Sequence, residues 1–148
     1  MSLNRGVVES CTRGRAEPDD FTRQRLFAES GGYCGKPDCE RELFKEVQGA
    51  RFHFAEIAHI CAAGDKGPRP NVALTAEERG AFENLILLCV LCHTEIDKAD
   101  DIYTDDIVRG WKAQHSQKLR QVFGVQRYAD RKSCRLTIEP ILDENRGI

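Results

Sequence analysis

The chain has 148 residues, of which 41% are hydrophobic and 31% charged, as in an ordinary globular domain with its own core. No run approaches the roughly 18 apolar residues that a membrane helix needs, and no apolar segment follows the first methionine, so we expect a cytoplasmic protein without a membrane partner. The net charge of −2 does not indicate a nucleic-acid-binding protein as a whole.

The N-terminal half is predicted to contain one helix, one metal-binding turn and one strand. Asp19 or Asp20 can cap the helix, and Gly31 and Gly32 stop it. The turn carries glycine and proline, which bend the backbone sharply enough for paired thiolates to converge. In chain order, the predictions are a flexible tail over residues 1–18, a helix from Asp19 or Asp20 to about Glu29, a turn over 34–39, a strand over 52–60 and a loop over 61–71.

The C-terminal half is predicted to be mainly helical around one apolar strand. Thr75 and Glu78 have the spacing of a capping box, and Ile107 and Trp111 begin an apolar repeat at helical spacing. The predictions are a helix from Thr75 to about Phe82, a strand over 85–90, a helix that begins near Cys92, a helix from Thr104 or Asp105 to Gly124, and a possible strand over 134–141 that Pro140 interrupts. We expect one α+β domain over residues 19–124, and a basic tail or a linker to a further domain over 125–148.

Two cysteine pairs predict a metal site. Seven cysteines without a secretory signal favour metal ligands and free thiols over disulfides. Zinc prefers four thiolate or imidazole ligands in a tetrahedron, and a site with four protein ligands has no open position, so the ion would be structural. A redox pair is the alternative for one CxxC motif alone. The predicted ligands are Cys34, Cys39, Cys89 and Cys92, and the predicted free thiols are Cys11, Cys61 and Cys134.

A histidine and an asparagine border the two predicted strands of the core. His59 lies at the end of the first strand, where it is either a satisfied core residue or a general base, since an imidazole with a pKa near 6.5 can accept a proton from water. Asn84 precedes the second strand, where its amide either caps the strand or orients the His59 ring through a hydrogen bond. His53 and His115 are interpreted as structural residues.

A second histidine adjoins the last cysteine of the predicted zinc site. His93 follows Cys92 directly and lies four residues before Asp97. Side chains at that spacing on a helix point the same way, so His93 and Asp97 can grip one divalent ion. The alternative is a surface ion pair without metal.

The segment from Ile107 to Arg135 is strongly basic although the whole chain is not. It holds eight basic residues and one acid, a net charge of +7. Such a run is either a solvated helix face or a surface that follows nucleic-acid phosphates. The residues predicted to contact the DNA backbone are Lys112, Lys118 and Arg120.

Taken together, these motifs resemble the HNH nucleases, in the zinc-stabilised branch of that family. The resemblance covers roughly residues 33–97 and rests on Ala58-His59-Ile60, Gly67-Pro68-Arg69, the run Asn84–Cys89, and Cys92-His93. It looks closest to the nuclease domains of bacterial phage-defence effectors, in which a nucleotide-sensing domain follows. The resemblance implies a ββα-metal, treble-clef-like core with flanking helices, and it implies that His59 is the general base, that Asn84 orients it and that His93 binds the catalytic metal.

One position departs from the family pattern. Many members carry a metal-binding Asp or His directly before the base, where this chain has Ala58. Glu56 projects to the same face of the predicted strand as Ala58, so Glu56 and Asp97 are the candidates to complete a catalytic site with His93. Imidazole and carboxylate together suit Mg²⁺, Mn²⁺ or Ni²⁺.

The implied activity is metal-dependent hydrolysis of phosphodiester bonds in double-stranded DNA, in bacterial defence or restriction. Arg69, in the loop after the base, is a candidate phosphate clamp. The alternatives are a non-catalytic zinc module that binds DNA or protein, with His59 and Asn84 structural, and a nuclease that acts on RNA.

Overall fold

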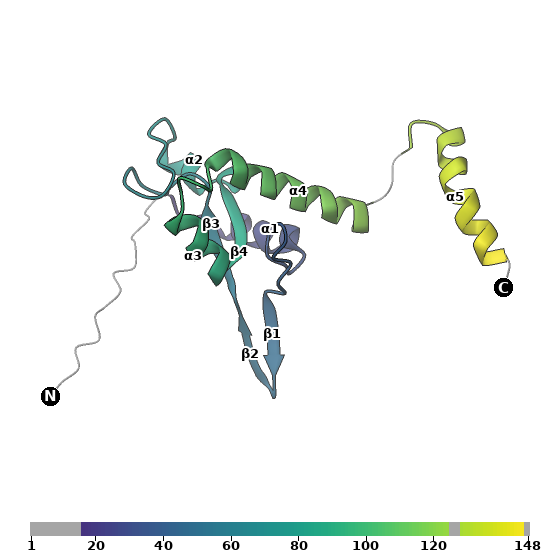
Figure 1. Ribbon diagram of the computed structural model, residues 1–148, viewed down its shortest axis with the longest axis horizontal. Helices are drawn as coiled ribbons and strands as arrows, with labels where there is room; N and C mark the ends of the chain where they lie inside the picture. Colours follow the sequence, from purple (N-terminus) through teal and green to yellow (C-terminus); the bar gives the residue numbers. More distant parts are fainter. Residues whose placement is uncertain (1–15, 125–127, 147–148) are drawn as a thin grey trace. The chain divides into compact units, whose positions relative to one another are not determined.

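The computed structural model describes residues 16–124 and 128–146. The chain divides into two compact units, Met1–Gln117 and Lys118–Ile148. Helices combine with two small antiparallel sheets, so the α+β class expected from the sequence is confirmed. The elements are α1 Asp20–Ser30, β1 Phe44–Val47, β2 Ala50–His53, β3 Ala55–His59, α2 Ala76–Gly80, a 3-10 turn Phe82–Asn84, β4 Leu85–Cys89, α3 Val90–Lys98, α4 Asp105–Phe123 and α5 Arg131–Arg146 (Figure 1).

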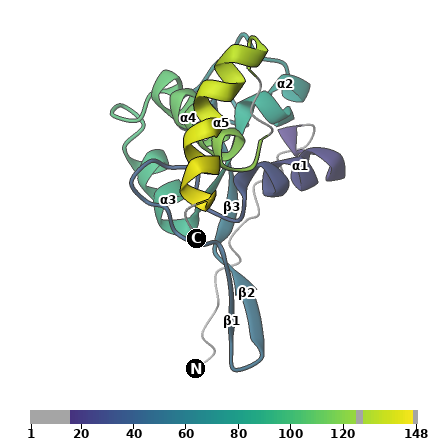
Figure 2. The ribbon, with the colours of Figure 1, turned by 90° about the vertical axis from the view of Figure 1, so that its right-hand side faces the viewer.

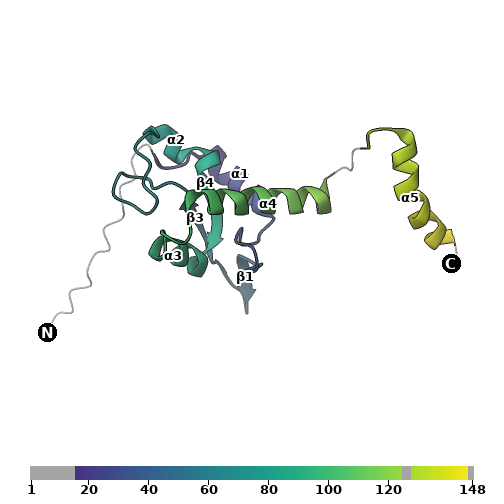
Figure 3. The same ribbon diagram turned by 45° about the horizontal axis from the view of Figure 1, so that its top comes forward.

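The central sheet of the first unit pairs β3 with β4. The strands are antiparallel, and His59 lies opposite Leu85 while Ala55 lies opposite Cys89. Every residue of β4 is buried, which explains its wholly apolar sequence. Helix α3 follows β4 directly and contacts both strands, and α1 contacts β4 (Figures 1 and 3). The order of two paired strands and a helix therefore positions the ends of β3 and α3 next to each other.

The second sheet is a hairpin that the sequence did not predict. Strands β1 and β2 are joined by Gln48 and Gly49, whose φ values of 49° and 84° suit a two-residue hairpin turn. All residues of both strands are exposed, and the hairpin projects from the rest of the first unit (Figures 1 and 2). This hairpin leads directly into β3.

The single strand expected over residues 52–60 is wrong in one respect, because it is divided between the two sheets. The division falls at Phe54, whose N–H donates to Leu43 O at 2.8 Å and whose carbonyl accepts from Val90 N at 3.0 Å. Residues before Phe54 pair with β1, and residues after it pair with β4. Sequence periodicity cannot show this change of partner, because both parts remain extended.

The predicted helix starts are confirmed by their caps. Asp19 accepts a hydrogen bond from Thr22 N at 2.8 Å and caps α1, and Gly31 ends that helix with a φ of 61°. Thr75 and Glu78 form the expected capping box of α2. The packed domain begins earlier than residue 19, since Ala16 and Pro18 are buried; residues 1–15 of the tail predicted over 1–18 lie outside the described residues.

The strand expected over residues 134–141 is wrong, because these residues belong to α5. Cys134, Ile138 and Ile141 recur at the spacing of a helix, and Pro140 is tolerated inside α5. Among the described helices, none combines the length and the apolar character needed to cross a bilayer.

Candidate functional site

The four cysteines predicted as zinc ligands come together in one cluster. Their Sγ atoms all lie within 4.8 Å of one another, and Cys39 Sγ lies 3.9 Å from Cys89 Sγ. Four sulfurs at about 2.3 Å from one zinc ion are separated by about 3.8 Å, so this cluster can hold a metal ion with the geometry of structural zinc. Cys34 and Cys39 belong to the turn after α1, Cys89 ends β4, and Cys92 lies in the first turn of α3.

The surroundings of these thiols suit metal ligands. Cys89 N donates to Cys34 Sγ at 3.3 Å, as backbone amides do to metal-bound thiolates. Burial raises the pKa of Cys34 to about 11 and also raises the pKa of Cys92. Cys34 and Cys92 therefore keep their protons until a cation replaces them, whereas for Cys39 the effect of burial is outweighed by hydrogen bonds, which lower its pKa. Binding of an ion would release protons.

Both histidines predicted to carry chemistry face one cleft beside the β3–β4 sheet. The cleft has a volume of about 770 Å³, and it is formed by the end of β3, the loop after it and the side of α3 that carries His93 and Asp97. His59, His93 and Asp97 line it, together with the loop residues 62–69. Residues far apart in the sequence thus meet around a space large enough for a ligand.

The His59 side chain is buried and hydrogen-bonded to the chain segment before α1. Its Nε2 atom lies 3.0 Å from Ala16 O, and its exposed fraction is 7%. Because a carbonyl oxygen can only accept, Nε2 must carry a proton, and in the neutral ring Nδ1 is then the proton acceptor. No sequence motif predicted this contact, and residues 1–18 were expected to be a flexible tail.

The side chain of Asn84 binds backbone groups. This corrects the expectation that its amide bonds the His59 ring. Both N–H groups of its side chain donate to carbonyls, those of Cys61 and Arg79, each at 2.9 Å. Its Oδ1 accepts from Cys61 N at 2.9 Å. Asn84 therefore fixes the chain two residues beyond His59 and can position that ring only through the backbone.

His93 is held between two carboxylates, one on each ring nitrogen. Nδ1 lies 2.5 Å from Glu56 Oε2, and Nε2 lies 3.3 Å from Asp97 Oδ2. The hydrogen bond to Asp97 raises the pKa of His93, burial opposes this, and the hydrogen bond to Glu56 adds to it. These contacts favour the doubly protonated imidazolium ring.

Glu56, His93 and Asp97, which were expected to bind one divalent ion, contact one another but do not surround a common position. Glu56 faces one ring nitrogen of His93 and Asp97 faces the other. An ion on one nitrogen of His93 can share only the carboxylate that faces that nitrogen. In the described part of the chain, the cysteine cluster is the one group of three or more Cys, His, Asp or Glu side chains arranged to hold an ion. Glu56, His93 and Asp97 can therefore supply at most two ligands together in this arrangement.

Arg69 is buried within the protein, which corrects its expected role as a phosphate clamp. Its side chain is 4% exposed and donates to Ile60 O at 2.7 Å and to Ile96 O at 2.6 Å. Nη2 donates further to His59 O at 3.2 Å and to Asp97 Oδ1 at 2.9 Å. The guanidinium joins β3 to α3. Because these contacts use most of its N–H donors, few remain for a ligand.

The Arg69 contact also sets the charge state of Asp97. Burial alone would raise the pKa of Asp97, but the hydrogen bonds from His93 and Arg69 outweigh it and lower the pKa. Asp97 is thus a carboxylate with one oxygen on Arg69 and the other facing His93.

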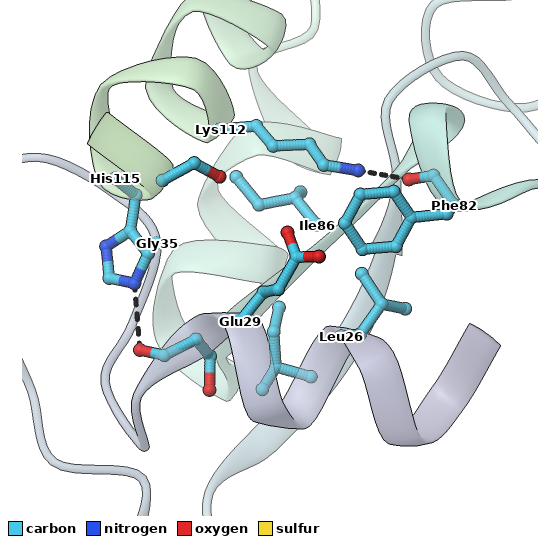
Figure 4. Close-up of a pocket in the computed structure, with 10 residues that line it drawn as sticks. Leu26, Glu29, Gly35, Phe82, Ile86, Lys112 and His115 are labelled. Carbon is cyan, nitrogen blue, oxygen red and sulfur yellow. Dashed lines mark hydrogen bonds between the residues drawn. The ribbon is translucent and has the colours of Figure 1, made fainter. Parts of the chain in front are cut away.

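Lys112 likewise points into the protein, so its expected role in DNA binding is corrected. Nζ donates to the carbonyl of Phe82 and lies 3.5 Å from the centroid of the Phe82 ring (Figure 4). It also donates to Leu85 O at 2.8 Å. Burial lowers the pKa of Lys112 to about 8. Sequence alone could not distinguish this lysine from Lys118 and Arg120, which are exposed as expected.

Neither the family models nor the curated proteins searched gave a match to this chain. Its function must be inferred from the residues themselves.

Proposed function

We propose that the protein is a metal-dependent HNH endonuclease that hydrolyses phosphodiester bonds in DNA. The observation that carries the proposal is the meeting of His59 and His93 in one cleft, from the end of β3 and the first turn of α3. The cysteine cluster lies where β4 ends and α3 begins, so a structural zinc ion there would fix the helix that carries His93. The shared cleft and the adjacent cysteine cluster together support a ββα-metal core, and they favour it over the alternative that the two histidines are only structural.

His59 is proposed as the general base. Its Nε2–H group is held by Ala16 O, so Nδ1 is the atom that would accept a proton from the attacking water. A neutral imidazole is a common general base, because its unprotonated ring nitrogen can take up a proton from water. Asn84 contributes indirectly, by fixing the backbone after His59.

His93 Nε2 and Asp97 Oδ2 are proposed as the protein ligands of the catalytic ion, which would displace the proton from Nε2 when it binds. They lie 3.3 Å apart, and both residues line the cleft. Glu56 on Nδ1 would then orient the ring, the usual part of a carboxylate behind a metal-binding histidine. When bound, Mg²⁺, Mn²⁺ or Ni²⁺ would supply charge stabilisation at a phosphate oxygen and at the leaving 3′ oxygen.

A non-catalytic zinc module that binds DNA or protein is the second candidate. Two observations favour it: Ala58 stands where many HNH nucleases carry a metal ligand, and two of the cations expected to meet DNA, Arg69 and Lys112, are used inside the protein. An RNA substrate, a role in phage defence and a nucleotide-sensing partner remain proposals from the resemblance.

A plasmid-nicking assay separates these candidates. Wild-type protein is incubated with supercoiled plasmid, or with a folded RNA, in Mg²⁺, Mn²⁺ or Ni²⁺. We expect His59→Ala to abolish nicking with its fold and zinc content unchanged. The matched control is His53→Ala, which removes a ring that packs against Phe27 and Phe44 away from the cleft and should leave nicking intact. Wild-type protein that binds DNA without cutting either substrate would establish the non-catalytic alternative.

A further inference from the structure

Helix α5 of the second unit has one apolar face. At 100° per residue, Cys134, Ile138, Ile141 and Leu142 fall within an arc of roughly 100°. Ile138, Ile141 and Leu142 expose 37%, 56% and 47% of their surface. Leu136, which is 67% exposed, lies on the opposite side of the helix. A stripe of this width is what a helix normally buries against a partner.

The charges of α5 run against its own dipole. The half 131–138 carries Arg131, Lys132 and Arg135 and has a net charge of +3, whereas the half 139–146 carries three acids and one arginine and has a net charge of −2. A helix N-terminus is stabilised by negative charge and a C-terminus by positive charge, so this distribution is unfavourable for α5 by itself. A lone helix of 16 residues that contains Pro140 is also marginal in water.

We propose that α5 pairs with α5 of a second copy of this chain, with the two helices antiparallel. In that arrangement the basic half of each helix lies beside the acidic half of the other, and the apolar faces cover each other. The acids of one helix also lie near the N-terminus of its partner, where the dipole favours them. A parallel pair would place +3 against +3 and would leave the dipole mismatch in place.

A second copy explains the charges better than nucleic acid does. A phosphate backbone would suit the basic half of α5 but would be repelled by Glu139, Asp143 and Glu144. Binding of nucleic acid would also leave the apolar face of α5 exposed to water. Only a partner with the reverse order of charge matches the whole helix, and an antiparallel copy of α5 has that order.

The first test measures the oligomeric state of the full chain by sedimentation equilibrium, with zinc present, across a dilution series. We expect a monomer–dimer equilibrium in the micromolar range, because two helices about 24 Å long make a small interface. Ile138→Asp combined with Ile141→Asp should raise the dissociation constant by roughly a hundredfold or more. Leu136→Asp is the matched control on the opposite side and should leave it unchanged. A monomeric wild type, or a dimer that survives the double substitution, overturns the proposal.

The second test measures direction. A charge-swapped chain carries the substitutions Arg131→Glu, Lys132→Glu, Arg135→Glu, Glu139→Lys, Asp143→Lys and Glu144→Lys. If the pairs are antiparallel, the swapped chain pairs with itself and is excluded from pairs with wild type, because like-charged halves would meet. If the pairs are parallel, mixed pairs predominate, which overturns the proposal. Fluorescently labelled chains distinguish the two results, and neither depends on nuclease activity.

Discussion

The His59 ring is anchored by the carbonyl of Ala16, at 3.0 Å and across 43 residues of sequence. A backbone carbonyl is a rigid acceptor that no substitution at position 16 removes, so the tautomer of His59 depends on how the segment before α1 is packed. Ala16 itself is 1% exposed. The orientation of the proposed base is thus set by packing.

Gly80→Ala tests this anchor, because Gly80 packs against the backbone of Ala16. An added Cβ at residue 80 would lie 2.9 Å from the C and O atoms of Ala16, and backbone atoms cannot turn aside as a side chain can. We expect roughly a tenfold or greater loss of kcat, since a misplaced base loses much of its contribution. Gly110→Ala, whose added Cβ would have nothing within 4 Å, is the control; an unchanged kcat in Gly80→Ala would show that the anchor is irrelevant to the base.

Zinc should be present at about one ion per chain and should be needed for folding, because structural zinc binding is worth roughly 10–16 kcal/mol. Elemental analysis of protein purified without chelators measures the first point. Cys89→Ala should lose both zinc and cooperative unfolding. Cys134→Ala, outside the cluster, should keep both. A well-folded Cys89→Ala protein would contradict the assignment.

Arg69→Met should destabilise the protein by about 1–3 kcal/mol, because it leaves the buried carbonyls of Ile60 and Ile96 without their donor. The ion pair adds little to this, since the Asp97 side chain is 37% exposed. Chemical denaturation monitored by circular dichroism measures it. Arg51→Met is the matched control, because Arg51 pairs with Glu46 at the surface, where its side chain is 82% exposed. If Arg69→Met kept full stability and lost only DNA affinity, Arg69 would be a phosphate ligand after all.

Lys112 should leave a signature in the dependence of stability on pH. Its folded pKa of about 8 lies below the ordinary 10.5, so between these values the unfolded chain binds more protons than the folded one. The free energy of unfolding of wild type, relative to that of Lys112→Met, should therefore rise as the pH increases through this window. Urea titrations of both proteins at several pH values give the difference, and a flat difference would mean that Lys112 stays charged throughout.

Asp97 and Glu56 should differ in their effect on the metal requirement. Asp97→Asn removes a proposed ligand and should raise the concentration of Mn²⁺ needed for half-maximal cleavage, whereas Glu56→Gln keeps an acceptor on His93 Nδ1 and should raise it less. DNA affinity without metal should not change in either variant. If both variants need the same Mn²⁺ concentration as wild type, the catalytic ion binds elsewhere.

Features that depend on local chemistry could be predicted from the sequence. The cysteine spacing predicted the cluster, and Asp19 and Thr75 predicted the starts of their helices. Features that depend on which way a chain or side chain turns could not. Phe54 changes sheets inside one extended run, and Arg69 reads as an ordinary loop cation until its four internal contacts are known.

Helix α5 is a second feature that could not be predicted from the sequence. Its apolar spacing was present in the sequence, but residues 134–141 were predicted as a possible strand that Pro140 interrupts. The Ala16 contact had no local signal, because it depends only on tertiary packing of a segment with few apolar residues.

The cysteine cluster also has a consequence for the order of assembly. Cys39 and Cys89 are 50 residues apart, and the chain between them carries both His59 and Asn84. Joining the two cysteine pairs closes a long loop, at an entropic cost that grows only slowly with its length. During synthesis, the last ligand to leave the ribosome is Cys92, followed at once by His93. The cleft therefore cannot mature on a nascent chain until both ends of this loop are available.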